Sequence, residues 1–160
     1  MIDVDGVISL FGFAPARPPA GRFALVDGIP HYLSATAGQH LRELAGGFEL
    51  VWCTGWEDKA NEYLPLALGL PGPLPYLSFE REVGRAHAHW KLAAIDRYAG
   101  PQRPLAWIDD ALDAPCLAWA RGRRGPTLLV STEPAVGMTD AHVARLVRWA
   151  TEAAPTRGQT

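Results

Sequence analysis

The sequence predicts a doubly wound α/β fold, in which a parallel β-sheet carries helices on both faces. Two observations lead to this prediction. Short apolar runs suited to buried strands alternate along the chain with segments of helical period, as in consecutive βαβ units. Acidic or hydroxyl side chains directly follow several of these runs, as is typical of the ligand-binding edge of such a sheet.

The expected strands are short, rich in large apolar residues and bounded by Gly, Pro or Asp. They cover residues 48–53, 74–79, 105–108 and 127–130. A further strand is expected before Asp3, although Met1 and Ile2 alone stand there and a central strand needs about five residues. We therefore expect that the natural chain begins upstream and that the first strand of the chain as given is frayed.

Helices are expected between the strands, each marked by a capping residue, an apolar period or a terminal glycine. They begin near Thr36 (in a capping box with Gln39), Trp56, His89, Asp113 and Thr139. Pro65 predicts a kink or an early end of the second helix. Residues 1–153 are expected to form one domain, and residues 154–160 a disordered tail.

One segment departs from this alternation. Residues 23–26 and 31–34 flank Asp27-Gly28, and this dipeptide between apolar strands is the strongest short-range signal of a β-hairpin. We expect the hairpin to follow the first strand directly.

Composition limits the classes of function. Of the 160 residues, 48% are apolar, which is enough for one sizeable core, and the net charge of −2 does not indicate a surface that binds polyanions throughout. The two cysteines are too few for a disulfide framework or a zinc site. No apolar run approaches the roughly 20 residues that span a bilayer, and no signal peptide is evident, so we expect a cytoplasmic protein.

Asp3-Val4-Asp5-Gly6 stands at the end of the first expected strand. Residues i and i+2 of a strand project to the same side, so Asp3 and Asp5 are expected to lie together. Such a pair repels itself unless a cation intervenes or one carboxyl holds a proton, and Mg²⁺ prefers oxygen ligands of this kind. Taken alone, the motif is more typical of a solvated turn.

Two further positions indicate phosphate binding. Thr54-Gly55 follows an apolar strand, and a hydroxyl followed by a glycine amide at a helix N-terminus forms a phosphate cradle. Lys91 stands in the first turn of its expected helix, where the helix dipole disfavours a cation unless an anion lies nearby. Each position also has a plainer interpretation, Thr54 as an N-cap and Lys91 as an exposed lysine.

A second acidic pair, Asp109-Asp110, ends the strand expected over residues 105–108. Two acids at the end of a buried strand are costly without a metal or hydrogen-bonding partners. Asp113 follows closely, but the N-cap of the next helix is the better interpretation of it. All four motifs thus fall where ligands bind a doubly wound sheet.

In this order, the motifs resemble those of the haloacid-dehalogenase-like (HAD-like) hydrolases, which have a Rossmann-like sheet. The motifs of that superfamily are a D-x-D pair, a strand-end Ser or Thr, a Lys or Arg, and a terminal acidic pair. They match Asp3/Asp5, Thr54, Lys91 and Asp109/Asp110, over residues 1 to about 131. The Val-Trp-Cys-Thr-Gly-Trp segment around Thr54 is most similar to the HAD domain associated with RNA-repair proteins.

The resemblance implies a Mg²⁺-dependent phosphohydrolase. Asp3 is expected to attack phosphorus and form an aspartyl-phosphate, and Asp5 to protonate the leaving oxygen and then activate water. Thr54, the Gly55 amide and Lys91 are expected to hold the phosphoryl group.

The same resemblance implies the ligands of the metal. Mg²⁺ is expected at Asp3, at the backbone carbonyl of Asp5 and at the acidic pair. Of that pair, Asp110 is expected to bind the metal directly. Asp109 is expected to be a further ligand or to support a ligand by hydrogen bonding.

The expected hairpin, over residues 22–34, occupies the place of the family's flap, and no insertion is long enough for a cap domain. An uncapped site excludes water poorly by itself but admits a phosphate on something large. We therefore expect a phosphorylated substrate such as a nucleotide, a nucleic-acid end or a protein, and a partner protein is a candidate for the missing lid. Trp56 is either a platform for base stacking or a packing residue.

The alternative expectation is a non-catalytic HAD-like domain that keeps the fold for binding or assembly. The short first strand favours this alternative, whereas the presence of all the motif side chains weighs against it. Dehalogenation is disfavoured, because Asp5 and the acidic pair suit Mg²⁺ and phosphate.

Overall fold

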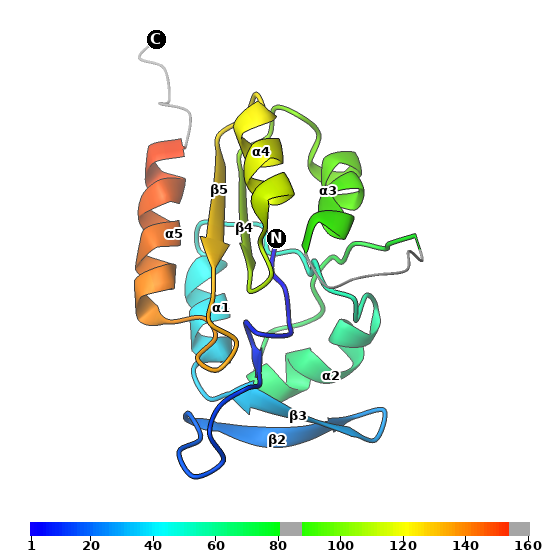
Figure 1. Cartoon of the computed structure of the whole chain (residues 1–160), viewed down its shortest axis with the longest axis vertical. Coiled ribbons are helices and arrows are strands. Elements are labelled where there is room, and N and C mark those ends of the chain that lie inside the picture. The colour runs from blue at the N-terminus through cyan, green and yellow to red at the C-terminus, as the bar shows by residue number, and fades with distance from the viewer. Residues whose placement is uncertain (81–87, 154–160) are drawn as a thin grey trace.

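The computed structural model describes residues 1–80 and 88–153. In chain order its elements are β1 (Ser9–Leu10), β2 (Gly21–Val26), β3 (Ile29–Ser34), α1 (Ala37–Leu44), α2 (Lys59–Leu68), the 3-10 turn η1 (Ala88–Lys91), α3 (Leu92–Ala99), β4 (Leu105–Asp109), α4 (Ala114–Gly122), β5 (Thr127–Ser131) and α5 (Asp140–Ala153). They form a mixed α/β fold with a parallel pair, β4–β5, and an antiparallel sheet in the order β1-β3-β2 (Figure 1). The tail expected over residues 154–160 lies outside the described residues.

The parallel pair is extended by single bridges. Ile2 forms a parallel bridge with Ile108 of β4, Trp52 forms one with Ile2, and Tyr76 forms one with Trp52. The parallel order is therefore Tyr76, Trp52, Ile2, β4 and β5. The full strands expected over residues 48–53 and 74–79 are not formed.

Prolines and a helix end account for these short pieces. Pro75 has no N–H to donate to a ladder, although its carbonyl accepts from the amide of Trp52 at 2.8 Å. The amide of Phe48 is used at the end of α1, where it donates to the carbonyl of Leu44 at 3.0 Å. Apolar runs predict strands but do not show where a proline or a helix end already occupies the backbone groups.

The first residues form backbone hydrogen bonds on both sides, although Ile2 forms single bridges and not the full strand expected before Asp3. The amide of Ile2 donates to Val51 at 2.9 Å, and its carbonyl accepts from Cys53 at 2.8 Å. On the other side, the amide of Asp3 donates to the carbonyl of Ile108 at 3.1 Å. Asp3 therefore ends a segment that both neighbours fix.

Helices cover both faces of the parallel segment (Figure 1). Successive residues of a strand point to opposite faces. Ala106 and Ile108 of β4 accordingly pack in the core that includes α1, α2 and α5, whereas Leu105 and Trp107 pack in the core that includes α3 and α4.

The expected hairpin is confirmed as β2 and β3, and β1 pairs with the other edge of β3. Asp27 and Gly28 have φ angles of +51° and +79°, and a type I′ turn needs positive φ at both positions. Tyr63 and Lys59 of α2 both donate to the Asp27 carboxylate. The three-stranded sheet thereby lies fixed below the carboxyl ends of β4 and β5 (Figure 1).

The helix expected to begin near Trp56 begins later in the chain. Helix α2 begins at Lys59, because residues 54–58 form turns and Glu57 has a φ of +51°. The helix then runs past Pro65 and ends at Gly69, so the expected early end does not occur.

The capping box at the start of α1 is also not formed. The hydroxyl of Thr36 caps no amide and instead pairs with that of Ser34 at 3.2 Å. Asp113, by contrast, is confirmed as the N-cap of α4, where it accepts from the amide of Cys116 at 3.2 Å. Within residues 1–80 and 88–153, no helix has the length and apolar character needed to cross a bilayer.

Candidate active site

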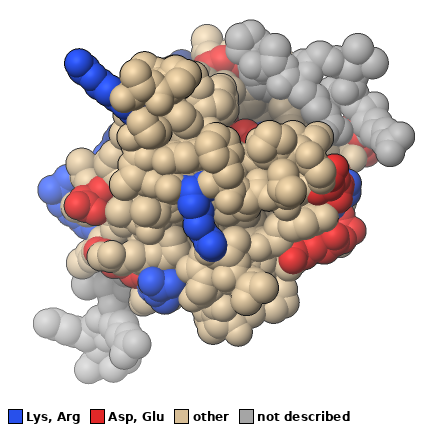
Figure 2. Space-filling model, turned by 90° about the horizontal axis from the view of Figure 1, so that it is seen from below, with Lys and Arg blue, Asp and Glu red and all other residues tan. Residues whose placement is uncertain are grey.

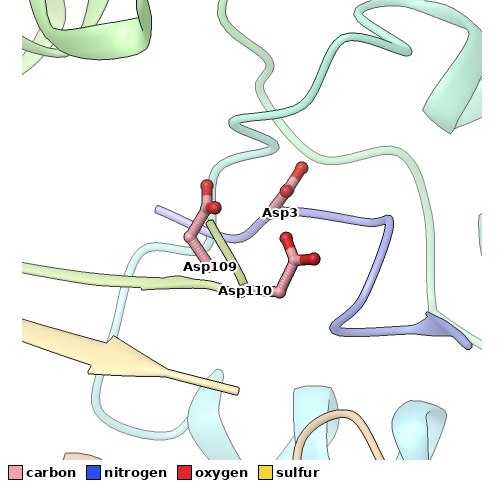
Figure 3. Close-up of side chains that lie close together, drawn as sticks. All are labelled: Asp3, Asp109 and Asp110. Carbon is pink, nitrogen blue, oxygen red and sulfur yellow. The ribbon is translucent and has the colours of Figure 1, made fainter. Parts of the chain in front are cut away.

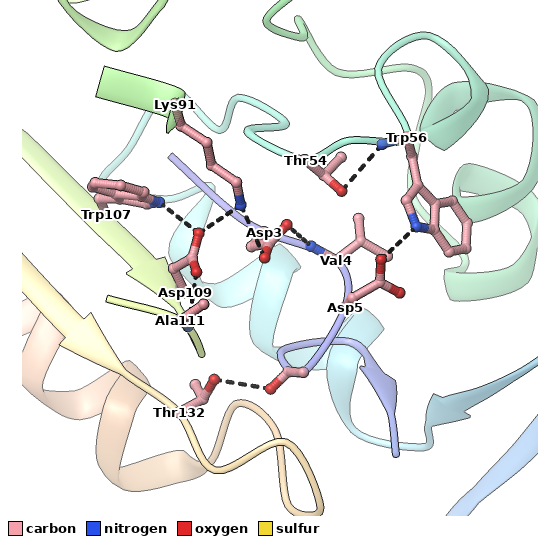
Figure 4. A network of polar contacts seen from close by, with 11 residues as sticks. Asp3, Val4, Asp5, Thr54, Trp56, Lys91, Trp107, Asp109, Ala111 and Thr132 are labelled. Carbon is pink, nitrogen blue, oxygen red and sulfur yellow. Dashed lines mark hydrogen bonds and ion pairs between the residues drawn. The ribbon is translucent and has the colours of Figure 1, made fainter. Parts of the chain in front are cut away.

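Three parallel segments end at the same edge. Asp3 follows the bridge at Ile2, Thr54 follows the bridge at Trp52, and Asp109 ends β4. Figure 4 shows their side chains beside that of Lys91, which comes from η1. The sequence predicted that these positions would converge, and they do.

The carboxylate of Asp3 is buried, with 6% of the residue exposed. Its Oδ1 accepts from the Val4 amide at 2.8 Å, and its Oδ2 lies 3.0 Å from Nζ of Lys91. Burial raises the pKa of Asp3 to about 7 against the opposing charge of Lys91, and the charge of Asp109 adds to the rise. The charge of Lys91 therefore does not fully offset the cost of burying the ionised carboxylate of Asp3.

Asp109 is fully buried, and its carboxylate accepts hydrogen bonds from three groups. Its Oδ2 accepts from Nζ of Lys91 at 2.6 Å and from the indole of Trp107 at 3.2 Å, and its Oδ1 accepts from the Ala111 amide at 3.0 Å. These bonds fix the carboxylate where it holds Lys91 against Asp3.

Lys91 is buried between the two carboxylates, with 3% of the residue exposed. Burial by itself lowers the pKa of Lys91, but the charges of Asp3 and Asp109 outweigh that effect and hold the pKa above its usual range. Lys91 thus stays protonated, and the plainer interpretation of an exposed lysine is wrong.

Asp110 completes an acidic cluster with Asp3 and Asp109 (Figure 3). One carboxylate oxygen from each residue lies within 4.8 Å of the others. Asp110 is only partly buried, and this burial, followed by the charge of Asp109, raises its pKa. Gly6 makes room for it, since a Cβ at this position would lie 2.4 Å from the Asp110 carboxyl.

The acidic cluster fits a small divalent cation. Its donors are carboxylate oxygens, which are the ligands that Mg²⁺ prefers. Lys91 offsets one negative charge, whereas Asp3, Asp109 and Asp110 together carry three when ionised. Burial is the main cause of the raised pKa values of Asp3 and Asp110 and the charge of Asp109 adds to it, so a bound cation would favour the ionised carboxylates.

The prediction that Asp5 lies beside Asp3 is wrong. The carbonyl of Val4 accepts from the amides of residues 7–9, and this turn ends the extended segment before Asp5. The Asp5 carboxylate instead accepts from the indole N–H of Trp56 at 2.9 Å (Figure 4). Its other oxygen lies 3.7 Å from Nδ1 of His31. It is about half exposed, at 48%.

Thr54 lies at the same edge but at the start of a turn. It is buried, and its Oγ1 accepts from the Trp56 amide at 3.4 Å, whereas Gly55 is exposed. Because α2 begins only at Lys59, the helix N-terminus expected directly after Thr54 is not formed. An anion held here would meet turn amides and Lys91 rather than a helix dipole.

Three contacts of the site, including that of Trp56 with Asp5, were not predicted from the sequence. Trp107 shares a strand face with Asp109, so the alternation of β4 could have revealed its bond to that carboxylate. His31 reaches Asp5 from β3, and no local pattern specifies how that sheet packs below the parallel segment.

No protein-family model matches the chain, and a search of curated proteins finds no match either. The case for a function therefore depends on the sequence motifs and on the geometry of the site.

Proposed function

We propose that this protein is a Mg²⁺-dependent phosphohydrolase of the HAD-like type, acting through an aspartyl-phosphate on Asp3. The observation that carries the proposal is the buried contact of Lys91 with Asp3 and Asp109 at the carboxyl end of parallel segments. These side chains come from distant parts of the chain, so no local structure accounts for their meeting. Their order along the chain is that of the HAD-like motifs.

The arrangement of the elements supports a doubly wound, Rossmann-like sheet as the fold. The parallel order of the bridged segments and the helices on both faces are features of that fold, and ligands bind it at the carboxyl ends of its strands. In this proposal β2 and β3 form the flap. Within the described residues, the interval between Asp5 and Thr54 contains this flap sheet and α1, and the interval between Thr54 and Lys91 contains α2, which leaves no place for a cap.

Asp3, Asp110 and the backbone carbonyl of Asp5 are the groups that would hold Mg²⁺. When bound, the ion supplies positive charge to the carboxylates and to the phosphate. Asp110 suits direct ligation because it is partly exposed, whereas Asp109 already accepts hydrogen bonds from three groups. In this proposal Asp109 therefore does not bind the ion and instead positions Lys91.

The side chains divide the chemistry among them. A carboxylate oxygen of Asp3 forms a bond to phosphorus while the bond to the leaving oxygen breaks. Asp5 gives its proton to the leaving oxygen and then takes one from the water that hydrolyses the aspartyl-phosphate. Lys91, the Thr54 hydroxyl and the Gly55 amide stabilise the negative charge of the transferring group.

A phosphate on a large or extended molecule, such as a nucleotide or a polynucleotide terminus, is the proposed substrate. The half-exposed carboxylate of Asp5 and the absence of a cap among the described elements support such a substrate. A partner protein that supplies a lid belongs to the same proposal. In its support, Phe23, Leu25 and Ile29 of the flap are exposed, and uncharged residues cover most of the underside of the molecule (Figure 2).

Hydrolysis of 4-nitrophenyl phosphate with and without Mg²⁺ tests the proposal. We expect turnover that depends on the metal and that Asp3→Asn abolishes. Asp58→Asn is the matched control, since Asp58 is exposed and makes no capping bond at α2. A wild-type protein with neither turnover nor a Mg²⁺-dependent rise in Tm would instead favour the non-catalytic binding domain.

A further inference from the structure

Trp56 contacts two functional groups of the site at once. Its indole N–H donates to Oδ2 of Asp5 at 2.9 Å, and its backbone amide donates to Oγ1 of Thr54 at 3.4 Å (Figure 4). One residue therefore links the carboxyl that moves protons to the hydroxyl on the phosphate side.

The chemistry of the indole distinguishes the two oxygens of Asp5. An indole nitrogen donates a hydrogen bond and accepts none. Its bond favours an unprotonated oxygen at Oδ2, because a carbonyl oxygen accepts better than a hydroxyl oxygen. The bond therefore fixes Oδ2 and leaves Oδ1, which lies 3.7 Å from Nδ1 of His31, as the oxygen that can face the leaving group.

His31 supports this arrangement from the flap. Its ring lies edge-on to that of Trp56, with centroids 4.6 Å apart and an interplanar angle of 68°. Its Nδ1 lies 3.0 Å from Oγ of Ser9, and the strands of these two residues, β3 and β1, pair with each other. The three-stranded sheet thus packs against the indole that holds Asp5.

We infer that Trp56 is the positioning residue that orients Asp5 for proton transfer, with His31 holding the indole in place. Trp56 is partly buried and packs against the core, as its packing interpretation expected, and the positioning role adds to that packing. It rests on the proposed function, because it concerns the acid–base step of that reaction.

The dependence of the rate on the leaving group separates this role from a structural one. A 4-nitrophenolate ion leaves without a proton, whereas an alkoxide needs one from Asp5. The kcat/KM value covers only the steps up to phosphoryl transfer to Asp3, so the later hydrolysis does not enter it.

Trp56→Phe keeps the aromatic ring and removes the N–H. For this variant we expect kcat/KM for a primary alkyl phosphate to fall by about 10- to 100-fold, and that for 4-nitrophenyl phosphate by less than about threefold. His31→Asn should show the same pattern with a smaller loss. In the Asp5→Asn background, Trp56→Phe should cause little further loss, because the two residues act as one unit.

Trp119→Phe is the matched control. Its indole also donates to a carboxylate, that of Asp96, at 3.1 and 3.0 Å, but outside the site. We expect this variant to change kcat/KM for the two substrates equally or not at all.

Equal losses for both substrates in Trp56→Phe would overturn the inference and leave the phosphohydrolase intact. A wild-type protein without Mg²⁺-dependent turnover would instead remove the proposed function. In that case NMR spectra test the contact itself. The chemical shift of the Trp56 indole N–H should change in Asp5→Asn, whereas that of Trp119 should stay the same. A Trp56 resonance that does not move would overturn the positioning role.

Discussion

The ammonium nitrogen of Lys91 lies 3.0 Å from Oδ2 of Asp3, and both residues are buried. A charge taken out of water costs several kcal/mol unless a partner compensates it. This pair therefore governs the stability of the site as well as its proposed chemistry.

Removal of the Lys91 charge should destabilise the protein strongly. Lys91→Met leaves the carboxylates of Asp3 and Asp109 buried without a cation, and we expect the free energy of unfolding in urea to fall by about 3–5 kcal/mol. Lys59→Met is the control, because Lys59 pairs with Asp27 at the surface, where water screens the charges and the pair adds little stability. Similar losses in the two variants would contradict the assignment of Lys91 to a buried ion pair.

Asp3 should make the stability of the metal-free protein depend on pH. Burial raises its pKa from 3.8 to about 7 against the opposing charge of Lys91, so the folded state keeps a proton that the unfolded state releases. The contribution of Asp3 is therefore full below pH 3.8 and is lost as the pH rises to about 7. Urea unfolding across this range measures it, and Asp3→Asn should flatten the dependence.

Mg²⁺ binding should release protons in the same pH range. A cation favours the ionised carboxylates, so its apparent affinity should rise with pH and level off above the pKa of Asp3, about 7. Calorimetric titrations at pH 6 in two buffers of different ionisation enthalpy measure the protons released. Identical heats in the two buffers would contradict the binding of the ion at Asp3.

The two members of the acidic pair should behave differently on substitution. Asp110→Asn should weaken Mg²⁺ binding with little change in stability, because Asp110 is partly exposed. Asp109→Asn should lower the affinity by about 10- to 100-fold and also lower the stability, because it disturbs two buried hydrogen bonds and one that is partly buried.

Asp113→Asn is the control for that pair, since Asp113 caps α4 and lies outside the acidic cluster. We expect its Mg²⁺ affinity to equal that of the wild type. If Asp110→Asn bound Mg²⁺ as tightly as this control, the assignment of Asp110 as a direct ligand would be wrong.

Gly6→Ala should weaken Mg²⁺ binding at the candidate metal site. Gly6 has a φ of +69°, and a Cβ there would lie 2.4 Å from the Asp110 carboxyl, so that carboxyl must move. We expect Mg²⁺ affinity to fall at least as far as in Asp110→Asn. Gly12→Ala has a similar φ of +76° but open space around the added methyl, so it controls for backbone strain alone.

The sequence predicted those features that local chemistry decides. The Asp27-Gly28 pair specifies its turn through positive φ, and Asp113 caps its helix through its own side chain. The convergence of Asp3 and Asp109 also followed, because parallel segments bring their carboxyl ends to one edge, and Lys91 reaches that edge from η1 at the start of the next helix.

Features that depend on competition between distant groups were not predictable. The turn at Val4, whose carbonyl accepts three amides, separates Asp5 from Asp3 although a strand would have placed them together. The contact of Trp56 with Asp5 depends on that turn and on the delayed start of α2. Neither has a sequence pattern of its own.

Identification of the phosphorylated residue tests the central claim most directly. Asp5→Asn, which keeps the proposed nucleophile and lacks the base for hydrolysis, is mixed with Mg²⁺ and 4-nitrophenyl phosphate, quenched in acid and analysed by mass spectrometry of its peptides. We predict a phosphoryl group on Asp3 that is absent without Mg²⁺ and absent from the variant that also carries Asp3→Asn. A phosphoryl group on another residue, or Mg²⁺-dependent turnover by Asp3→Asn, would contradict the account.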